Sequence, residues 1–98
     1  MALITTPQEL ADELHIDPSP TELATLGTLI KDASAIIRGS ISHDLTEEAV
    51  ITVASEQFNR LVGSVASSLY YDRALTDGFS HGQMIILQQL TGIIKGGA

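Results

Sequence analysis

The residues of this chain that could carry out chemistry are its three histidines, its twelve carboxylates and its serines. The histidines, His15, His43 and His81, fall at a predicted helix end, in a predicted loop and at a predicted helix start. No two of them lie four residues apart on one helix, as a helical zinc motif would require. We therefore interpret them as solvated or capping residues and predict no metal site.

The carboxylates and serines give no clearer sign of catalysis. Asp12–Glu13 and Glu47–Glu48 are adjacent pairs, whose side chains point about 100° apart on a helix and do not converge on one substrate atom. We expect no serine in a Gly-x-Ser-x-Gly nucleophile elbow, and the scattered glycines predict no phosphate-binding loop. The chain is therefore predicted not to be an enzyme and to need no cofactor. The catalytic alternative is a site that joins His43 or His81 to a nearby carboxylate.

Composition favours a soluble acidic protein. The chain has 98 residues, a net charge of −7 and no cysteine, so neither a disulfide nor a thiolate metal site can form. Its five Lys and Arg residues are dispersed, which argues against sequence-specific nucleic-acid binding. No apolar run approaches the roughly 18 residues of a membrane span. We expect one domain over residues 1–98, located in the cytoplasm and not in a membrane.

Helix-start signals predict an all-α bundle of about four helices. Thr6-Pro7-Gln8-Glu9 and Ser19-Pro20-Thr21-Glu22 each place a hydroxyl, a proline and a glutamate in capping-box order. The first helix should end near His15, and the second at Gly39, a typical stop residue. The core face of the second helix is predicted from apolar residues three and four apart, with two more widening it: Leu23, Leu26, Ile30, Ala33 and Ile37, then Leu29 and Ile36.

The third helix is predicted to be the longest, from about Glu47 to about Tyr71, and to form a central strut. Asp44 or Thr46 can cap its start. Its predicted apolar stripe and the residues beside it are Val50, Ala54, Phe58, Leu61, Val65 and Leu69, then Val53, Val62 and Ala66. Gly63 lies in mid-helix, where glycine costs about 1 kcal/mol relative to alanine.

The last helix is predicted to begin at Ser80, after a loop over residues 72–79 with a turn at Asp77-Gly78. Gln83 lies where a capping box would place it. The residues expected on the core face are Met84, Leu87, Leu90 and Ile94, whereas Ile85, Ile86 and Ile93 fall elsewhere.

One feature of this last helix points to a partner. Met84-Ile85-Ile86-Leu87 places apolar side chains on every side of the helix, more than the core of one small domain readily covers. We predict an intersubunit or partner interface formed by Met84, Ile85, Ile86 and Ile93. The alternative is a central helix buried entirely by its own domain. A weaker candidate is the face of small residues formed by Gly63, Ser64, Ser67 and Ser68.

Three stretches of the sequence, taken in order, resemble a known protein family. They are Ile4-Thr5-Thr6-Pro7-Gln8-Glu9-Leu10-Ala11; then Leu29-Ile30-Lys31-Asp32-Ala33-Ser34-Ala35-Ile36-Ile37-Arg38; and a long helix ending in Leu69-Tyr70-Tyr71-Asp72-Arg73 before a loop and a terminal helix. In this order they resemble the head-tail connector (adaptor, or head-completion) proteins of tailed bacteriophages, in particular the small actinophage or prophage type. The resemblance covers nearly the whole chain and rests on short structural motifs.

This resemblance implies a structural, non-catalytic protein of the virion that is present in the host cytoplasm during assembly. It implies a homo-oligomeric ring beneath the portal protein, which joins the capsid to a tail-side connector or tail-completion protein. Related assemblies commonly form only on their template, so a monomeric free chain is compatible with such a ring. Family members often carry a longer loop before the last helix and a C-terminal extension that reaches the portal. Here only Lys95-Gly96-Gly97-Ala98 follows Ile94.

The alternative interpretation of the same residues is a small acidic protein-interaction module, such as a regulator that binds a helix of a host protein in an apolar groove. The Asp32-Ala33-Ser34 segment within the matching order of helices favours the connector interpretation over this one.

Overall fold

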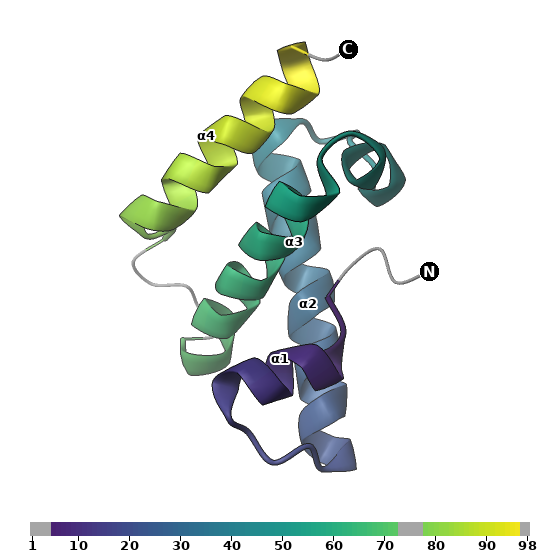
Figure 1. Cartoon of the computed structure of the whole chain (residues 1–98), viewed down its shortest axis with the longest axis vertical. Coiled ribbons are helices and arrows are strands. Elements are labelled where there is room, and N and C mark those ends of the chain that lie inside the picture. The colour runs from purple at the N-terminus through teal and green to yellow at the C-terminus, as the bar shows by residue number, and fades with distance from the viewer. Residues whose placement is uncertain (1–4, 73–77, 97–98) are drawn as a thin grey trace.

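The computed structural model describes residues 5–72 and 78–96, and these residues form four helices and no strand. The helices are α1 (Pro7–Leu14), α2 (Pro20–Ile41), α3 (Glu47–Tyr71) and α4 (His81–Gly96). In Figure 1, α2 and α3 form the centre of the bundle, α1 lies across the lower end, and α4 lies along α3. The prediction of a small all-α bundle with one long central helix is confirmed.

The predicted helix starts are correct, and one of them has a second use. At α1, Thr6 Oγ1 accepts a hydrogen bond from Glu9 N, and Glu9 Oε1 accepts one from Thr6 N, which completes a capping box. At α2, Ser19 Oγ accepts from Glu22 N. The Glu22 carboxylate accepts instead from the Tyr70 hydroxyl, at 2.7 Å. This bond ties the start of α2 to the end of α3, 48 residues later.

Two predicted helix ends behave differently. α1 ends at Leu14, close to His15 as expected, and His15 follows as a left-handed cap with a φ of 58°. The prediction that α2 stops at Gly39 is wrong, because α2 continues to Ile41 and is capped by Ser42. Ile41 is buried in the core, and this burial favours two more helical residues despite the weak helix propensity of the exposed Gly39.

The four helices share one aliphatic core around Phe58, whose side chain is fully buried. The predicted stripes of α2 and α3 are buried, except that Leu23 is only partly covered. Two flanking residues were assigned to the wrong side: Ile36 is 37% exposed and Val53 is 50% exposed. On α2 the stripe widens through Leu29, as predicted, and through Ser34 and Ile41 in place of Ile36.

A kink in α3 accounts for the position of Val53. The next residue, Ala54, has non-helical backbone angles (φ −148°, ψ 55°) and remains buried. In the turn before the kink, the Thr52 hydroxyl donates to the Glu48 carbonyl at 2.8 Å, a contact that often accompanies helix bending. The break turns Val53 toward solvent and still keeps Val50 and Ala54 in the core. Thr46 caps the helix start by accepting from Ala49 N.

The last helix is rotated relative to the prediction. Its buried residues are Gln83, Leu87 and Leu90, with Ile94 partly buried, so Gln83 occupies the core position that was assigned to Met84. Ser80 caps α4 as predicted, because Ser80 Oγ accepts from Gln83 N and Gln83 Oε1 accepts from Ser80 N. Gly78 has a φ of 68°, which suits the predicted turn. The other turn residue, Asp77, lies outside the described residues.

Candidate functional site

The predicted interface residues on α4 divide into two pairs. Met84 and Ile85 are exposed, at 39% and 43%, whereas Ile86 and Ile93 are partly buried against the core. The outer stripe of α4 is formed by residues three or four apart, all of them exposed: Gly82, Ile85, Gln89, Gly92 and Gly96. Met84 borders this stripe. The structure therefore leaves part of the predicted interface open to a partner.

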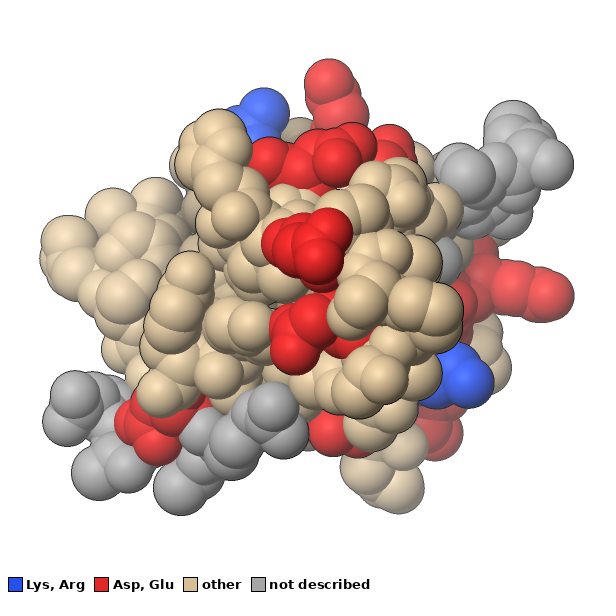
Figure 2. Space-filling model, turned by 90° about the horizontal axis from the view of Figure 1, so that it is seen from below, with Lys and Arg blue, Asp and Glu red and all other residues tan. Residues whose placement is uncertain are grey.

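Charge distinguishes this surface from the rest of the molecule. Among the four described helices, α4 alone has no Asp or Glu, and its only Lys or Arg is Lys95. In contrast, α1, the link after it and the start of α2 carry five carboxylates before the first lysine or arginine, Lys31: Glu9, Asp12, Glu13, Asp17 and Glu22. Figure 2 shows this acidic end from below, with Lys and Arg only at its edges. The molecule thus combines an acidic end with one helix that carries no carboxylate.

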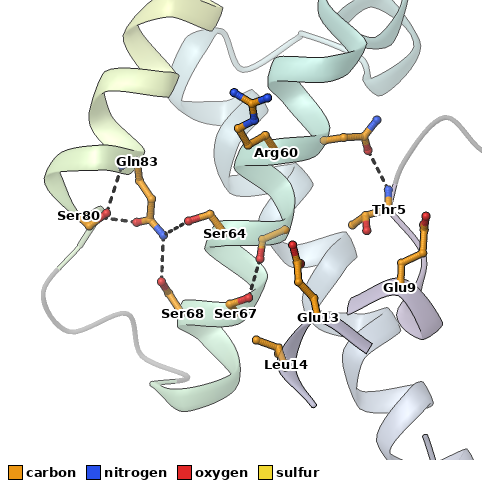
Figure 3. Close-up of a pocket in the computed structure, with 12 residues that line it drawn as sticks. Thr5, Glu9, Glu13, Leu14, Arg60, Ser64, Ser67, Ser68, Ser80 and Gln83 are labelled. Carbon is orange, nitrogen blue, oxygen red and sulfur yellow. Dashed lines mark hydrogen bonds between the residues drawn. The ribbon is translucent and has the colours of Figure 1, made fainter. Parts of the chain in front are cut away.

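The second candidate site is a polar groove of about 890 Å³ between α1, α3 and the start of α4 (Figure 3). Two parallel rows of α3 residues, each four apart, form its floor: Asn59, Gly63 and Ser67, then Arg60, Ser64 and Ser68. Glu9, Glu13 and Leu14 line the side that belongs to α1, and Ser80 and Gln83 line the side that belongs to α4. This groove includes the face of small residues that was the weaker prediction.

Gln83 fastens α4 to this floor. Its side chain is 4% exposed, and its Nε2 donates to Ser64 Oγ at 3.0 Å and to Ser68 Oγ at 2.9 Å. Its Oε1 accepts from Ser80 N, so one side chain both caps α4 and bridges two turns of α3. The group that packs against Ser64 and Ser68 is therefore the side-chain amide of Gln83 in the same chain.

Replacing Gln83 by alanine is expected to lower the free energy of unfolding by about 1–3 kcal/mol, because three hydrogen bonds of a buried side chain are lost, one of them the capping contact to Ser80 N. Gln88→Ala is the matched control, since Gln88 is exposed on the same helix, and its expected change is within about 0.5 kcal/mol. Urea denaturation of both variants measures the difference. Equal midpoints would show that Gln83 does not hold α4 in place.

The Asp-Ala-Ser…Arg segment behind the connector resemblance has a structural role. Ser34 is fully buried, and its hydroxyl donates to Glu47 Oε2 at 2.6 Å. Arg38 donates from Nε to Ser34 Oγ at 3.1 Å and from Nη1 to the Leu45 carbonyl at 3.4 Å. These bonds fix the turn between α2 and α3. Asp32 is exposed and takes no part in this network.

The expectation that the chain has no Gly-x-Ser-x-Gly sequence is wrong, because Gly78-Phe79-Ser80-His81-Gly82 matches this pattern. The nucleophile elbow of that pattern joins a strand to a helix, whereas here the described residues contain no strand. Ser80 Oγ instead accepts a hydrogen bond as the cap of α4. The motif is therefore explained by helix capping.

Further chemistry is limited in the part of the chain that the structure describes. No three His, Asp or Glu side chains of residues 5–72 and 78–96 are grouped so that they could hold a metal ion. Within the same residues, no helix combines the length and the hydrophobicity needed to cross a bilayer. His15, His43 and His81 are all exposed, and His15 and His81 lie at helix ends.

Comparison of the chain with protein-family models, curated proteins and solved structures found no match in any of the three.

Proposed function

We propose that this chain is a structural connector subunit of a tailed phage or prophage particle, which assembles into a ring between portal and tail. The observation that carries the proposal is the exposed apolar surface of α4 around Met84 and Ile85, on the one described helix without a carboxylate. The resemblance of three sequence stretches to connector proteins supplies the identity of the assembly.

Electrostatics supports a contact between copies at α4. Two copies that each carry a net charge of −7 repel one another wherever acidic surfaces meet. A contact through α4 brings no pair of carboxylates together. The partner face on the neighbour differs from α4, because a ring requires a head-to-tail interface of two complementary surfaces.

The contact surface is small, which bears on the state of the free protein. A helix of 16 residues is about 24 Å long, and a contact limited to one such helix covers less than the roughly 800 Å² per partner of a standard interface. We therefore expect the isolated chain to be monomeric at micromolar concentration and to assemble only when a template gathers the copies.

Co-sedimentation with the portal protein encoded in the same genome tests the proposal. The expected result is a stable complex that shows rings on the portal by negative-stain microscopy, from a chain that is monomeric alone. A mixture that sediments as two separate species at concentrations of tens of micromolar would contradict the connector function.

A further inference from the structure

The floor of the groove between α1, α3 and α4 offers hydrogen-bond donors on the part next to Gln83 of α4. Ser64 Oγ and Ser68 Oγ each accept from Gln83 Nε2, so each hydroxyl retains its own hydrogen. Neither hydroxyl donates to an acceptor within residues 5–72 or 78–96. Both side chains line the groove and are only partly covered. They present two donors one helical turn apart.

The opposite side of the groove offers acceptors. The Glu13 carboxylate is exposed and has no hydrogen bond or ion pair with the described part of the chain. Its Oε2 lies 3.9 Å from the place that a Cβ would occupy on Gly63, so the carboxylate reaches over the floor of the groove (Figure 3). Glu9 uses Oε1 to cap Thr6 N, and its second oxygen remains available. The α1 side of the groove therefore carries two carboxylates.

The size and polarity of the groove select the class of ligand. Small-molecule sites are mostly apolar and enclose their ligand, whereas this groove is open, and Leu14 is the only apolar side chain among the described residues that line it. An extended polypeptide presents regularly spaced carbonyls that suit a row of hydroxyl donors. The same floor already binds a backbone N–H group, because Thr5 N donates to Asn59 Oδ1 at 2.8 Å.

We propose that the groove binds an extended polypeptide segment that carries a basic side chain. The carbonyls of the segment accept from Ser64 and Ser68, and its lysine or arginine lies against Glu13 and Glu9. Arg60 lines the same groove and has no ion pair with the described residues, so it repels a second cation at its own end and orients the segment. This inference does not rest on the connector function.

Titration of the isotope-labelled protein with two capped heptapeptides, acetyl-GASKSAG-amide and acetyl-GASMSAG-amide, tests this binding by NMR. Saturable shifts of the amides around Ser64, Ser68 and Gln83 are expected for both peptides, and about two- to fivefold tighter binding is expected for the lysine peptide.

Glu13→Gln should remove this preference for the lysine peptide. Glu48→Gln makes the same charge change at an exposed carboxylate outside the groove and should retain it. Equal binding of the two peptides, or shifts spread over Asp32 and Glu48, would overturn the proposal.

Gly63→Ala provides an independent test. Among the described residues, a Cβ at Gly63 meets only Glu13 Oε2, at 3.9 Å, so the variant should fold, and its urea midpoint should rise because alanine favours the helix. The added methyl group narrows the groove floor, so smaller amide shifts are expected at equal peptide concentration. Unchanged peptide binding by this stable variant would contradict the assigned floor. Portal binding is measured separately, so either proposal can fail without the other.

Discussion

Phe58→Ala is expected to lower the free energy of unfolding by about 3–5 kcal/mol, the range for removal of a fully buried aromatic side chain. Phe58 is the largest fully buried residue of the described chain and lies in a core that is otherwise built from aliphatic side chains. The other two aromatic side chains packed against this core, Tyr70 and Phe79, are only partly buried, and the Tyr70 hydroxyl is held by Glu22. A domain of this size has about 5–15 kcal/mol of stability in total, so the change is large.

Urea denaturation followed by circular dichroism measures this effect, and Tyr71→Ala is the aromatic control. Tyr71 is 71% exposed and contacts the ring of Tyr70 edge-on, so its loss should change the free energy of unfolding by less than about 1 kcal/mol. Similar costs for the two variants would show that the core is not organised around Phe58. Phe58→Leu should lie between wild type and Phe58→Ala, because it leaves a smaller cavity.

Local signals in the sequence predicted the order of the elements correctly. The hydroxyls of Thr6, Ser19, Thr46 and Ser80 each cap a helix, because a short side chain at that position satisfies backbone N–H groups that the helix leaves free. Such capping depends on residues only two or three positions away, so no knowledge of the tertiary structure is needed. The period of the apolar residues likewise predicted most of the core of α2 and α3.

The errors occur where tertiary contacts outweigh local preference. Gly39 does not end α2, because burial of Ile41 stabilises another half turn. Gln83 takes the core position expected for Met84, because Ser64 and Ser68 satisfy both hydrogens of its amide. Hydropathy alone ranks methionine above glutamine for burial. The pairing depends on the register of α4 against α3, which the sequence of α4 does not contain.

The candidate sites were predictable to different extents. Met84 and Ile85 stood out because an apolar run covers all sides of a helix, a property of the local sequence. The groove was predicted only in part, as the weaker candidate face of small residues, although Asn59-Arg60, Gly63-Ser64 and Ser67-Ser68 recur every four residues and form a polar pattern on α3. What was missing is the position of α1, which brings Glu13 over Gly63 from 50 residues away.

Met84→Asp combined with Ile85→Asp is expected to abolish ring formation on the portal and to leave the fold of the monomer intact. Both side chains are exposed in the single chain, so the substitutions remove little buried apolar area. In an assembled ring the two carboxylates would be buried against the next copy without a partner, and burying an unpaired charge is strongly unfavourable. The same change would also add acidic groups to the one described helix that has none.

Ala24→Asp combined with Ala35→Asp separates this effect from a general increase in charge. Both alanines are exposed on α2, and the double variant also lowers the net charge by two. Circular dichroism and the urea midpoint check the fold of each variant, and co-sedimentation with the portal protein measures assembly. Rings from the α2 variant but not from the α4 variant are expected. If both variants assemble, the surface around Met84 and Ile85 is not the contact between copies. If neither does, net charge rather than the α4 surface controls assembly.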